Sequence, residues 1–197
     1  ASDRGLQAIV NQLNDSSVYT FNASLVATAD IDTLPEISAY DVVVIGGTLS
    51  DYSELNGVAP VLLPYVEAGG GLIATGWTLN DAQYLNGEDR ADFDTVVPVN
   101  TSYWNWSYYY DVTVTPTGAH PIVEGLDGNG FYVGSDGEYY NYVEYPGASP
   151  LVDPGATVLA TVGSISVAAA KDLGAGRSAY LGPSFAYPQS GPGLRTG

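Results

Sequence analysis

The sequence predicts an α/β fold, a three-layer sandwich with a mainly parallel central sheet. Residues 41–45 form an apolar run that closes on two glycines, which is typical of a strand buried on both faces. Residues 58–67 have helical spacing, and residues 72–75 supply a second buried strand after a run of three glycines. Strand, helix, glycine-rich turn and strand make a βαβ unit, from which sandwiches with a parallel sheet are built.

Before this unit, residues 4–13 are predicted to form an amphipathic helix. Their apolar side chains Leu6, Ile9, Val10 and Leu13 follow the i, i+3, i+4, i+7 spacing of one helical face. Residues 18–26 carry β-branched and aromatic residues, which favours a short strand.

After residue 92 the pattern changes to extended segments and aromatic runs. Residues 94–99 and 110–115 are expected to be extended, and the aromatic runs cover residues 103–110 and 138–145. We interpret about 100–145 as an aromatic-rich β insertion that lengthens or caps the sheet. Strands are then predicted at 157–162 and 166–170, and residues 167–170 and 177–181 are expected to form a terminal β-hairpin.

Length and composition indicate one folded domain over residues 1–197, with a strongly acidic surface. Five Lys and Arg stand against 22 Asp and Glu, so the formal net charge is −17. Such a chain repels phosphate backbones, and we expect no nucleic-acid partner. The absence of Cys excludes disulfides, thiolate metal sites and cysteine nucleophiles. The apolar runs are far shorter than the roughly 18 residues of a membrane span, so we expect no membrane insertion.

Four segments, in their order and spacing, carry a resemblance to a known family: residues 41–47, 65–73, 120–126 and 168–182. Together they resemble the class I glutamine amidotransferase-like superfamily, which is flavodoxin-like, in its trehalose-utilisation-type branch. That branch includes domains embedded in large secreted bacterial proteins. The resemblance implies a nucleophile on the turn after the strand at 72–75 and a late His-x-Glu motif.

Neither catalytic group of that superfamily stands at its place in this chain. The turn consists of Gly76, Trp77 and Thr78; Gly and Trp cannot attack a carbonyl, and Thr78 would need a base close by. Residues 182–188 contain no His, and the sole His, His120, lies elsewhere. The resemblance therefore implies a catalytically degenerate domain, and we expect no catalytic residues.

The same resemblance implies that the chain starts almost at the family's first helix, without the central strand before it, and stops at residues 193–197 without a closing helix. We expect a fragment that lacks the first strand and last helix. The alternative is that another chain or segment completes the sheet.

The aromatic residues are the candidate ligand-binding groups, with 16 Tyr and 3 Trp in the chain. Flat rings with polar tips could stack on sugars or form an assembly interface. The alternative is that they pack the inserted layer. The candidates are Trp77, Tyr103, Trp104, Trp106 and Tyr108.

Two further kinds of site are weaker candidates. Asp127, Asn129 and Asp136 lie on glycine-rich turns and offer oxygen ligands of the kind that Ca2+ prefers, although ordinary turns need the same residues. No other cofactor is expected, and His120 is predicted to cap a loop through a hydrogen bond. The glycosylation candidates, each in an Asn-x-Ser/Thr sequon, are Asn14, Asn22, Asn100 and Asn105.

The sequence thus favours a non-catalytic structural or interaction module of an extracellular or cell-surface protein. Its expected partners are copies of itself or other domains of a larger protein. One alternative is a carbohydrate-binding module that uses Trp77, Trp104 and Trp106 to bind glycans. The other is a hydrolase with a different active site, built on carboxylates such as Asp81 or Glu138.

Overall fold

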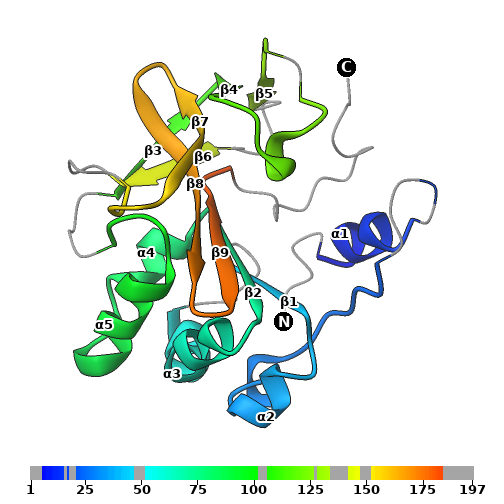
Figure 1. Ribbon diagram of the computed structural model, residues 1–197, viewed down its shortest axis with the longest axis vertical. Coiled ribbons are helices and arrows are strands. Elements are labelled where there is room, and N and C mark those ends of the chain that lie inside the picture. Colours follow the sequence, from blue (N-terminus) through cyan, green and yellow to red (C-terminus); the bar gives the residue numbers. More distant parts are fainter. Residues whose placement is uncertain are drawn as a thin grey trace.

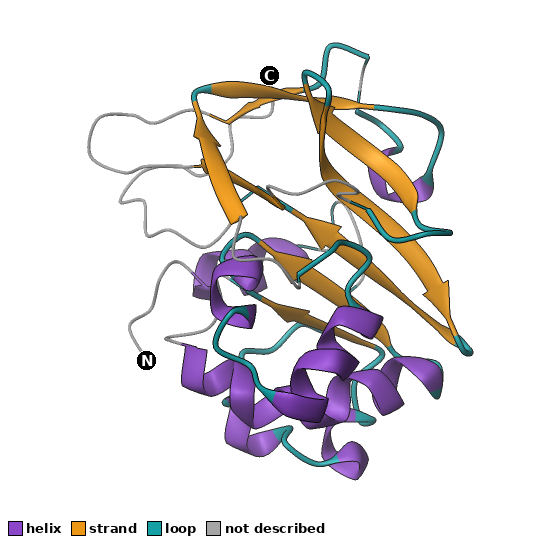
Figure 2. Ribbon diagram, turned by 90° about the vertical axis from the view of Figure 1, so that its left-hand side faces the viewer, coloured by secondary structure: helices purple, strands orange, loops and turns teal. Residues whose placement is uncertain are grey.

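A computed structural model describes residues 6–15, 17, 21–46, 52–101, 106–126, 128–133, 142–146 and 152–183 (Figure 1). The helices are α1 (Leu6–Leu13), α2 (Leu34–Ile37), α3 (Tyr52–Glu67), α4 (Thr78–Ala82) and α5 (Gly87–Val96), with 3-10 turns η1 (Thr28–Asp30) and η2 (Pro121–Val123). Most of the helices gather at one end of the molecule, and the strands extend past them to the other (Figure 2). The fold is mixed α/β.

The main sheet has seven strands in the order β1-β2-β9-β8-β7-β4-β5. Their bounds are β1 (Val42–Ile45), β2 (Gly71–Thr75), β4 (Val112–Pro116), β5 (Phe131–Val133), β7 (Thr157–Val162), β8 (Ile165–Leu173) and β9 (Gly176–Leu181). Only β1, β2 and β9 are parallel neighbours; the other pairs are antiparallel. The prediction of a mainly parallel sheet is therefore wrong, because tight turns rather than helices connect β7, β8 and β9.

The predicted β insertion contributes to two sheets. β4 and β5 lengthen the main sheet at one edge, and β3 (Trp106–Tyr110) pairs with β6 (Tyr142–Pro146) in a separate antiparallel ribbon. The terminal hairpin is confirmed, since β8 and β9 pair antiparallel from Ala168 and Leu181 to Leu173 and Gly176.

Helices α3 and α5 cover one face of the sheet. Ser178 of β9 donates its hydroxyl to the carbonyl oxygen of Val96 in α5 at 2.6 Å, and Leu72, Ala74 and Tyr180 pack into the same core. A second core lies farther along the sheet, around Val114, Leu159 and Val167. Figure 1 shows α1 set apart from the other helices, beyond β1. The described helices thus do not clearly build the third layer of the predicted sandwich.

The opposite face of β1 is open. Val42 is 51% exposed and Val44 is 40% exposed, whereas Val43 and Ile45 point into the core. The expectation that this strand is buried on both faces is wrong, because only the face of β1 that carries Val43 and Ile45 packs into the core.

Two local predictions fail for identifiable reasons. The described residues 21–26 form no strand, because the side chain of Asn14 takes both backbone groups of Ala23: Nδ2 donates to its carbonyl oxygen (2.9 Å) and Oδ1 accepts its N–H (2.7 Å). Residues 94–96 are the end of α5 rather than an extended segment, and Val99 makes only an isolated bridge to Val152.

Candidate functional site

The turn after β2 has the geometry of a strained elbow. Trp77 has φ 73, in the left-handed region that residues with a side chain rarely adopt, and α4 begins at the next residue. The resemblance placed a nucleophile at this turn. The structure puts an indole at its strained position, so the backbone strain is present without a nucleophilic group.

Glu144 of the β6 ribbon occupies the space beside this elbow. Its Oε2 accepts the N–H of Leu79 at 3.1 Å, and its Oε1 accepts the N–H of Asn80 at 3.0 Å. The hydroxyl of Tyr180 lies 3.1 Å from Oε2 and also donates to the carbonyl oxygen of Glu144 at 3.1 Å. The Glu144 side chain is fully buried. The carboxyl group therefore satisfies backbone donors that α4 leaves free at its start.

Burial raises the pKa of Glu144 from its ordinary value of 4.5 to about 8. The hydrogen bonds from Leu79, Asn80 and Tyr180 lower the pKa in part, and the nearby charge of Asp81 raises it. At neutral pH the folded protein thus holds Glu144 mainly in its neutral form.

This burial predicts a pH dependence of stability. Because the pKa of Glu144 is higher in the folded state than in the unfolded chain, the folded state binds the extra proton. The contribution of Glu144 is most favourable below pH 4.5 and falls by a few kcal/mol as the pH rises from 4.5 to about 8. Urea unfolding at pH 5 and pH 8 measures the loss, and a Glu144→Gln variant should lack this part of the pH dependence.

Several groups around Glu144 are buried, although Asn80 is only half-buried. Thr78 is 1% exposed and Asp81 is 8% exposed. Within the described residues the Thr78 hydroxyl has no hydrogen-bond partner, and a Cβ added at Gly46 would lie 2.6 Å from it. The buried Glu144 and Thr78 therefore pack against the elbow, and the hydrogen bonds of Glu144 stabilise the turn.

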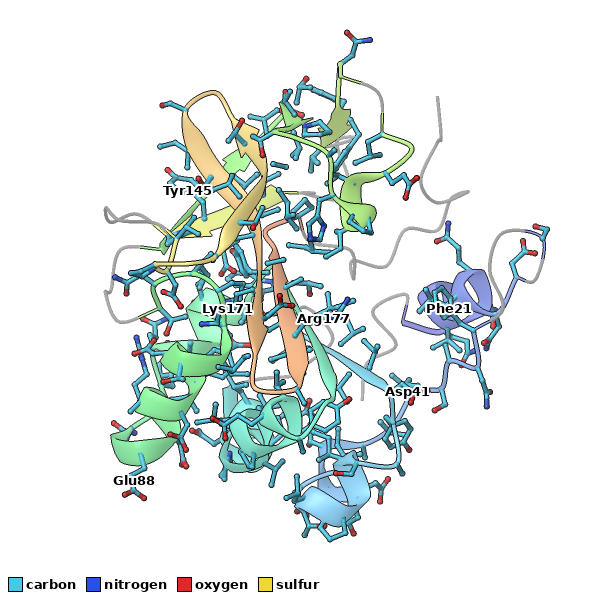
Figure 3. All side chains as sticks on the ribbon, in the orientation of Figure 1. Phe21, Asp41, Glu88, Tyr145, Lys171 and Arg177 are labelled. Carbon is cyan, nitrogen blue, oxygen red and sulfur yellow. The ribbon has the colours of Figure 1, made fainter. Side chains whose placement is uncertain are left out.

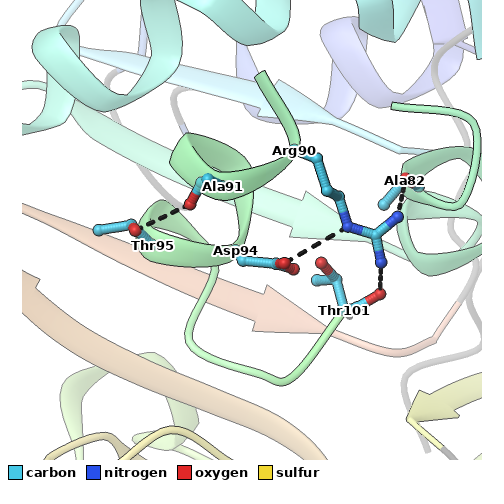
Figure 4. Close-up of polar contacts among 6 residues, drawn as sticks. All are labelled: Ala82, Arg90, Ala91, Asp94, Thr95 and Thr101. Carbon is cyan, nitrogen blue, oxygen red and sulfur yellow. Dashed lines mark hydrogen bonds and ion pairs between the residues drawn. The ribbon is translucent and has the colours of Figure 1, made fainter. Parts of the chain in front are cut away.

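Arg90 of α5 binds the C-terminal end of α4, the helix that follows the elbow (Figure 4). Its guanidinium donates to the carbonyl oxygen of Ala82 at 2.5 Å and to that of Thr101, and its Nε lies 3.4 Å from a carboxylate oxygen of Asp94. Burial raises the pKa of Asp94, and the charge of Arg90 opposes that shift. Arg90 thereby ties α4, α5 and the start of the insertion together.

The structure describes only part of the predicted aromatic site. Trp77 is half-buried at the elbow. Tyr103 and Trp104 lie outside the described residues, as do the side chains of Trp106 and Tyr108 on β3. Whether these rings share a surface therefore stays a prediction.

The other candidates are only partly described. Asn129 lies in an exposed turn, whereas Asp127 and Asp136 fall outside the described residues, as does Glu138. In the part of the chain that is described, no three His, Cys, Asp or Glu side chains gather as a metal site would require. His120 caps η2 as predicted, since its Nδ1 accepts the N–H of Ile122 at 3.2 Å.

Among the sequons, Asn22 is exposed and Asn100 is half-buried, and Asn105 is outside the described residues. Asn14 is exposed, but its Nδ2, the atom a glycan would occupy, bonds to Ala23. Glycosylation stays a prediction at all four.

Sequence reasoning missed Glu144, although it lies inside the second aromatic run. The signal was a lone carboxylate in a strand whose neighbours Val143 and Tyr145 are apolar or aromatic. A charge in such a strand indicates a specific buried partner, and the partners here are distant in sequence.

No protein-family model and no curated protein matches the sequence. Solved structures match the fold. The cytoplasmic protein STM3548 of Salmonella typhimurium superposes with a TM-score of 0.61 at 18% identity, over 88% of this chain and 74% of that one. A ThuA-like protein of Bacteroides uniformis superposes with a TM-score of 0.56 at 15% identity, over 92% and 76%. This is a ThuA-like fold.

A part of a larger enzyme also has this fold. The exo-β-1,4-mannosidase Op5Man5 of an Opitutaceae bacterium superposes with a TM-score of 0.52 at 15% identity, over 91% of this chain but 26% of that one. At these identities the similarities concern the fold, which agrees with the resemblance noted in the sequence, and they carry no activity to this chain.

Among the described helices, none combines the length and the apolar character that crossing a membrane requires.

Proposed function

We propose that this chain is a non-catalytic interaction module that associates with a second copy of itself through the edge of β1. One observation carries the proposal. In the described part of the chain, no strand pairs with the outer backbone edge of β1, and the side chains of Val42 and Val44 on its outer face are exposed. The expected location outside the cell stays a prediction, as does glycan binding.

The residues at the elbow support the proposal that the module is non-catalytic. Trp77 replaces a nucleophile, the donors of Leu79 and Asn80 are taken by Glu144, and Glu144 itself is enclosed. A reaction at this turn would need the turn and the β3–β6 ribbon to separate first. We therefore place the function, self-association, at the exposed edge of β1 and not at the elbow.

The register of β1 supports strand addition. The N–H of Gly71 bonds to the carbonyl oxygen of Asp41, and Val42 is the register partner of Gly71. In a parallel pair, the N–H and C=O of one residue point to the same side, so Val43 faces β2 and the backbone groups of Val42 and Val44 face outward. Among the described residues nothing pairs with this outer edge. An exposed edge of this kind is a template for another strand.

The side chains of Val42 and Val44 favour a second copy of the chain as the partner that pairs with the edge of β1. Val42 and Val44 are apolar and exposed, and a two-fold axis beside β1 would pair β1 antiparallel with β1 of the other copy. Each copy would then cover the other's valines, and the sheet would continue across the dimer. A similar fold forming 26% of the Op5Man5 chain is compatible with a module that works next to other domains.

The test is a proline at position 44. Because the N–H of Val44 points away from β2, Val44→Pro removes an outward donor without removing a β1–β2 hydrogen bond, and edge strands tolerate proline. We expect light scattering and sedimentation to show a wild-type dimer and a monomeric Val44→Pro variant. Val44→Thr, which keeps the N–H and the branched shape, is the matched control and should still associate.

The dependence of association on salt concentration distinguishes self-association from binding to an oppositely charged partner. With a net charge of −17 on each copy, self-association should strengthen as ionic strength rises, because salt screens the repulsion. A wild-type monomer at both low and high salt would refute the proposal, and so would a Val44→Pro variant that dimerises as well as Val44→Thr.

A further inference from the structure

A hollow of about 290 Å³ lies on the open face of the sheet, where η2 overhangs β1, β2, β8 and β9. Its walls include Val42, Ile73, Ile122 and Ala179, which are apolar, together with His120 and Arg177. The volume is close to the lower end of small-molecule sites, roughly 300 Å³. The hollow is separate from the elbow, and none of the groups around Glu144 lines it.

Arg177 points into the open side of the sheet. Along β9 the neighbouring Ser178 and Tyr180 face α5 and the core, so alternation places Arg177 and Ala179 on the opposite face. Figure 3 shows Lys171 on the side of α5 and Arg177 on the other side of the hairpin. Gly71 is the register partner of Arg177 on β2, and a Cβ at Gly71 would lie 3.0 Å from a methyl group of Val42.

The guanidinium of Arg177 has no bound partner in the described part of the chain. The other two cations described there are engaged: Arg90 with Asp94, and Lys171 with Asp153 at 2.7 Å. Asp172 is the cross-strand neighbour of Arg177, yet no ion pair joins these two residues. Among the described residues, Arg177 is thus a cation without an ion-pair partner, in a hollow that apolar side chains line in part.

His120 supplies a second donor to the same hollow. Its Nδ1 accepts the N–H of Ile122, so in the neutral ring the proton resides on Nε2. The capping bond thereby holds the ring in one tautomer and leaves a donor for a ligand.

We propose that this hollow binds a small monocarboxylate with an apolar body. The fork of Arg177 matches the two oxygens of a carboxylate, and the apolar wall at Ile73, Ile122 and Ala179 suits the body of the ligand. Asp172 beside Arg177 and the net charge of −17 disfavour a phosphate dianion. Val44 does not line the hollow, but Val42 does and also lies in the proposed dimer interface, so this proposal is tested at Arg177.

Benzoate is the probe, with benzamide as its neutral counterpart and inorganic phosphate as the competing anion. Titration at low ionic strength, followed by amide chemical shifts in NMR, should show saturable benzoate binding with shifts at Ile73, His120 and Arg177. Benzamide should bind at least about tenfold more weakly, and phosphate should not displace benzoate at equal concentration.

The variant is Arg177→Gln, which removes the charge from an exposed side chain, and thermal unfolding checks that it is folded. It should weaken benzoate binding at least about tenfold. Gln12→Glu on the exposed surface of α1 changes the net charge by the same amount and should bind benzoate like the wild type. The proposal is overturned if benzoate does not saturate, if Arg177→Gln binds it unchanged, or if phosphate or benzamide binds equally well.

Discussion

Replacing Glu144 by alanine is expected to lower the free energy of unfolding at pH 5 by about 3–5 kcal/mol. The change deletes a fully buried side chain and leaves the N–H groups of Leu79 and Asn80 without their acceptor. Each buried donor left unsatisfied costs about 1–3 kcal/mol. Urea unfolding followed by tryptophan fluorescence and circular dichroism measures the loss.

The effect of Glu144→Ala should be smaller at pH 8. There the wild type also bears the cost of keeping a carboxyl group with a pKa of about 8 in its buried site, and the variant does not. Glu144→Gln retains the volume but directs an amide donor at backbone donors, so it should lie between the wild type and Glu144→Ala at pH 5. A Glu144→Ala variant as stable as the wild type at pH 5 would show that the carboxyl group does not hold the elbow.

Replacing Gly182 by alanine is expected to cost at least about 3 kcal/mol. A Cβ at this position would lie 2.1 Å from the carbonyl oxygen of Glu144 and 2.7 Å from that of Val167. Both contacts are to backbone, and the backbone is held there by two hydrogen bonds of 2.8 Å, from Gly182 to Val167 and from Glu144 to Gly182. Relief of the contact would therefore break the bonds that position Glu144.

Gly57→Ala is the matched control for Gly182→Ala. Gly57 lies within α3, and a Cβ there meets nothing within 4 Å. Alanine is the better helix former, so this variant should gain about 0.5–1 kcal/mol. Chemical unfolding of both variants gives the comparison. Equal and small effects would mean that the chain around Gly182 can move away from an added methyl group.

Much of the fold follows from local pattern. The helical spacing at residues 58–67 belongs to α3, the predicted strands at 41–45 and 72–75 correspond to β1 and β2, and the Gly-rich turn at residue 174 joins β8 and β9. These elements are specified by hydrophobic period and turn residues close by in the chain. The failures at residues 21–26 and 94–96 arose where a side chain or a longer helix took up the backbone groups instead.

Of the candidate site, the family resemblance indicated the turn after residues 72–75, and residue identity showed that Gly76 and Trp77 there cannot act as a nucleophile. It did not indicate Glu144 or Arg177 as functional groups. Glu144 bonds to Leu79 and Asn80 from 64 or more positions away, and Arg177 lines the same hollow as η2 although the two are far apart in the sequence. The residues near Glu144 or Arg177 in the sequence do not reveal which distant residues the fold brings beside them.

By itself the sequence determined the α/β class, the acidic charge, the absence of thiol chemistry and the order of the elements around the βαβ unit. Only the tertiary structure decided that the sheet is mixed, that β1 is an open edge, and that the elbow is sealed by a carboxyl group with a raised pKa. The physical reason is the range of the interactions. Hydrophobic period and turn preference act over a few residues, whereas strand order, burial and desolvation depend on segments that only the folded chain brings together.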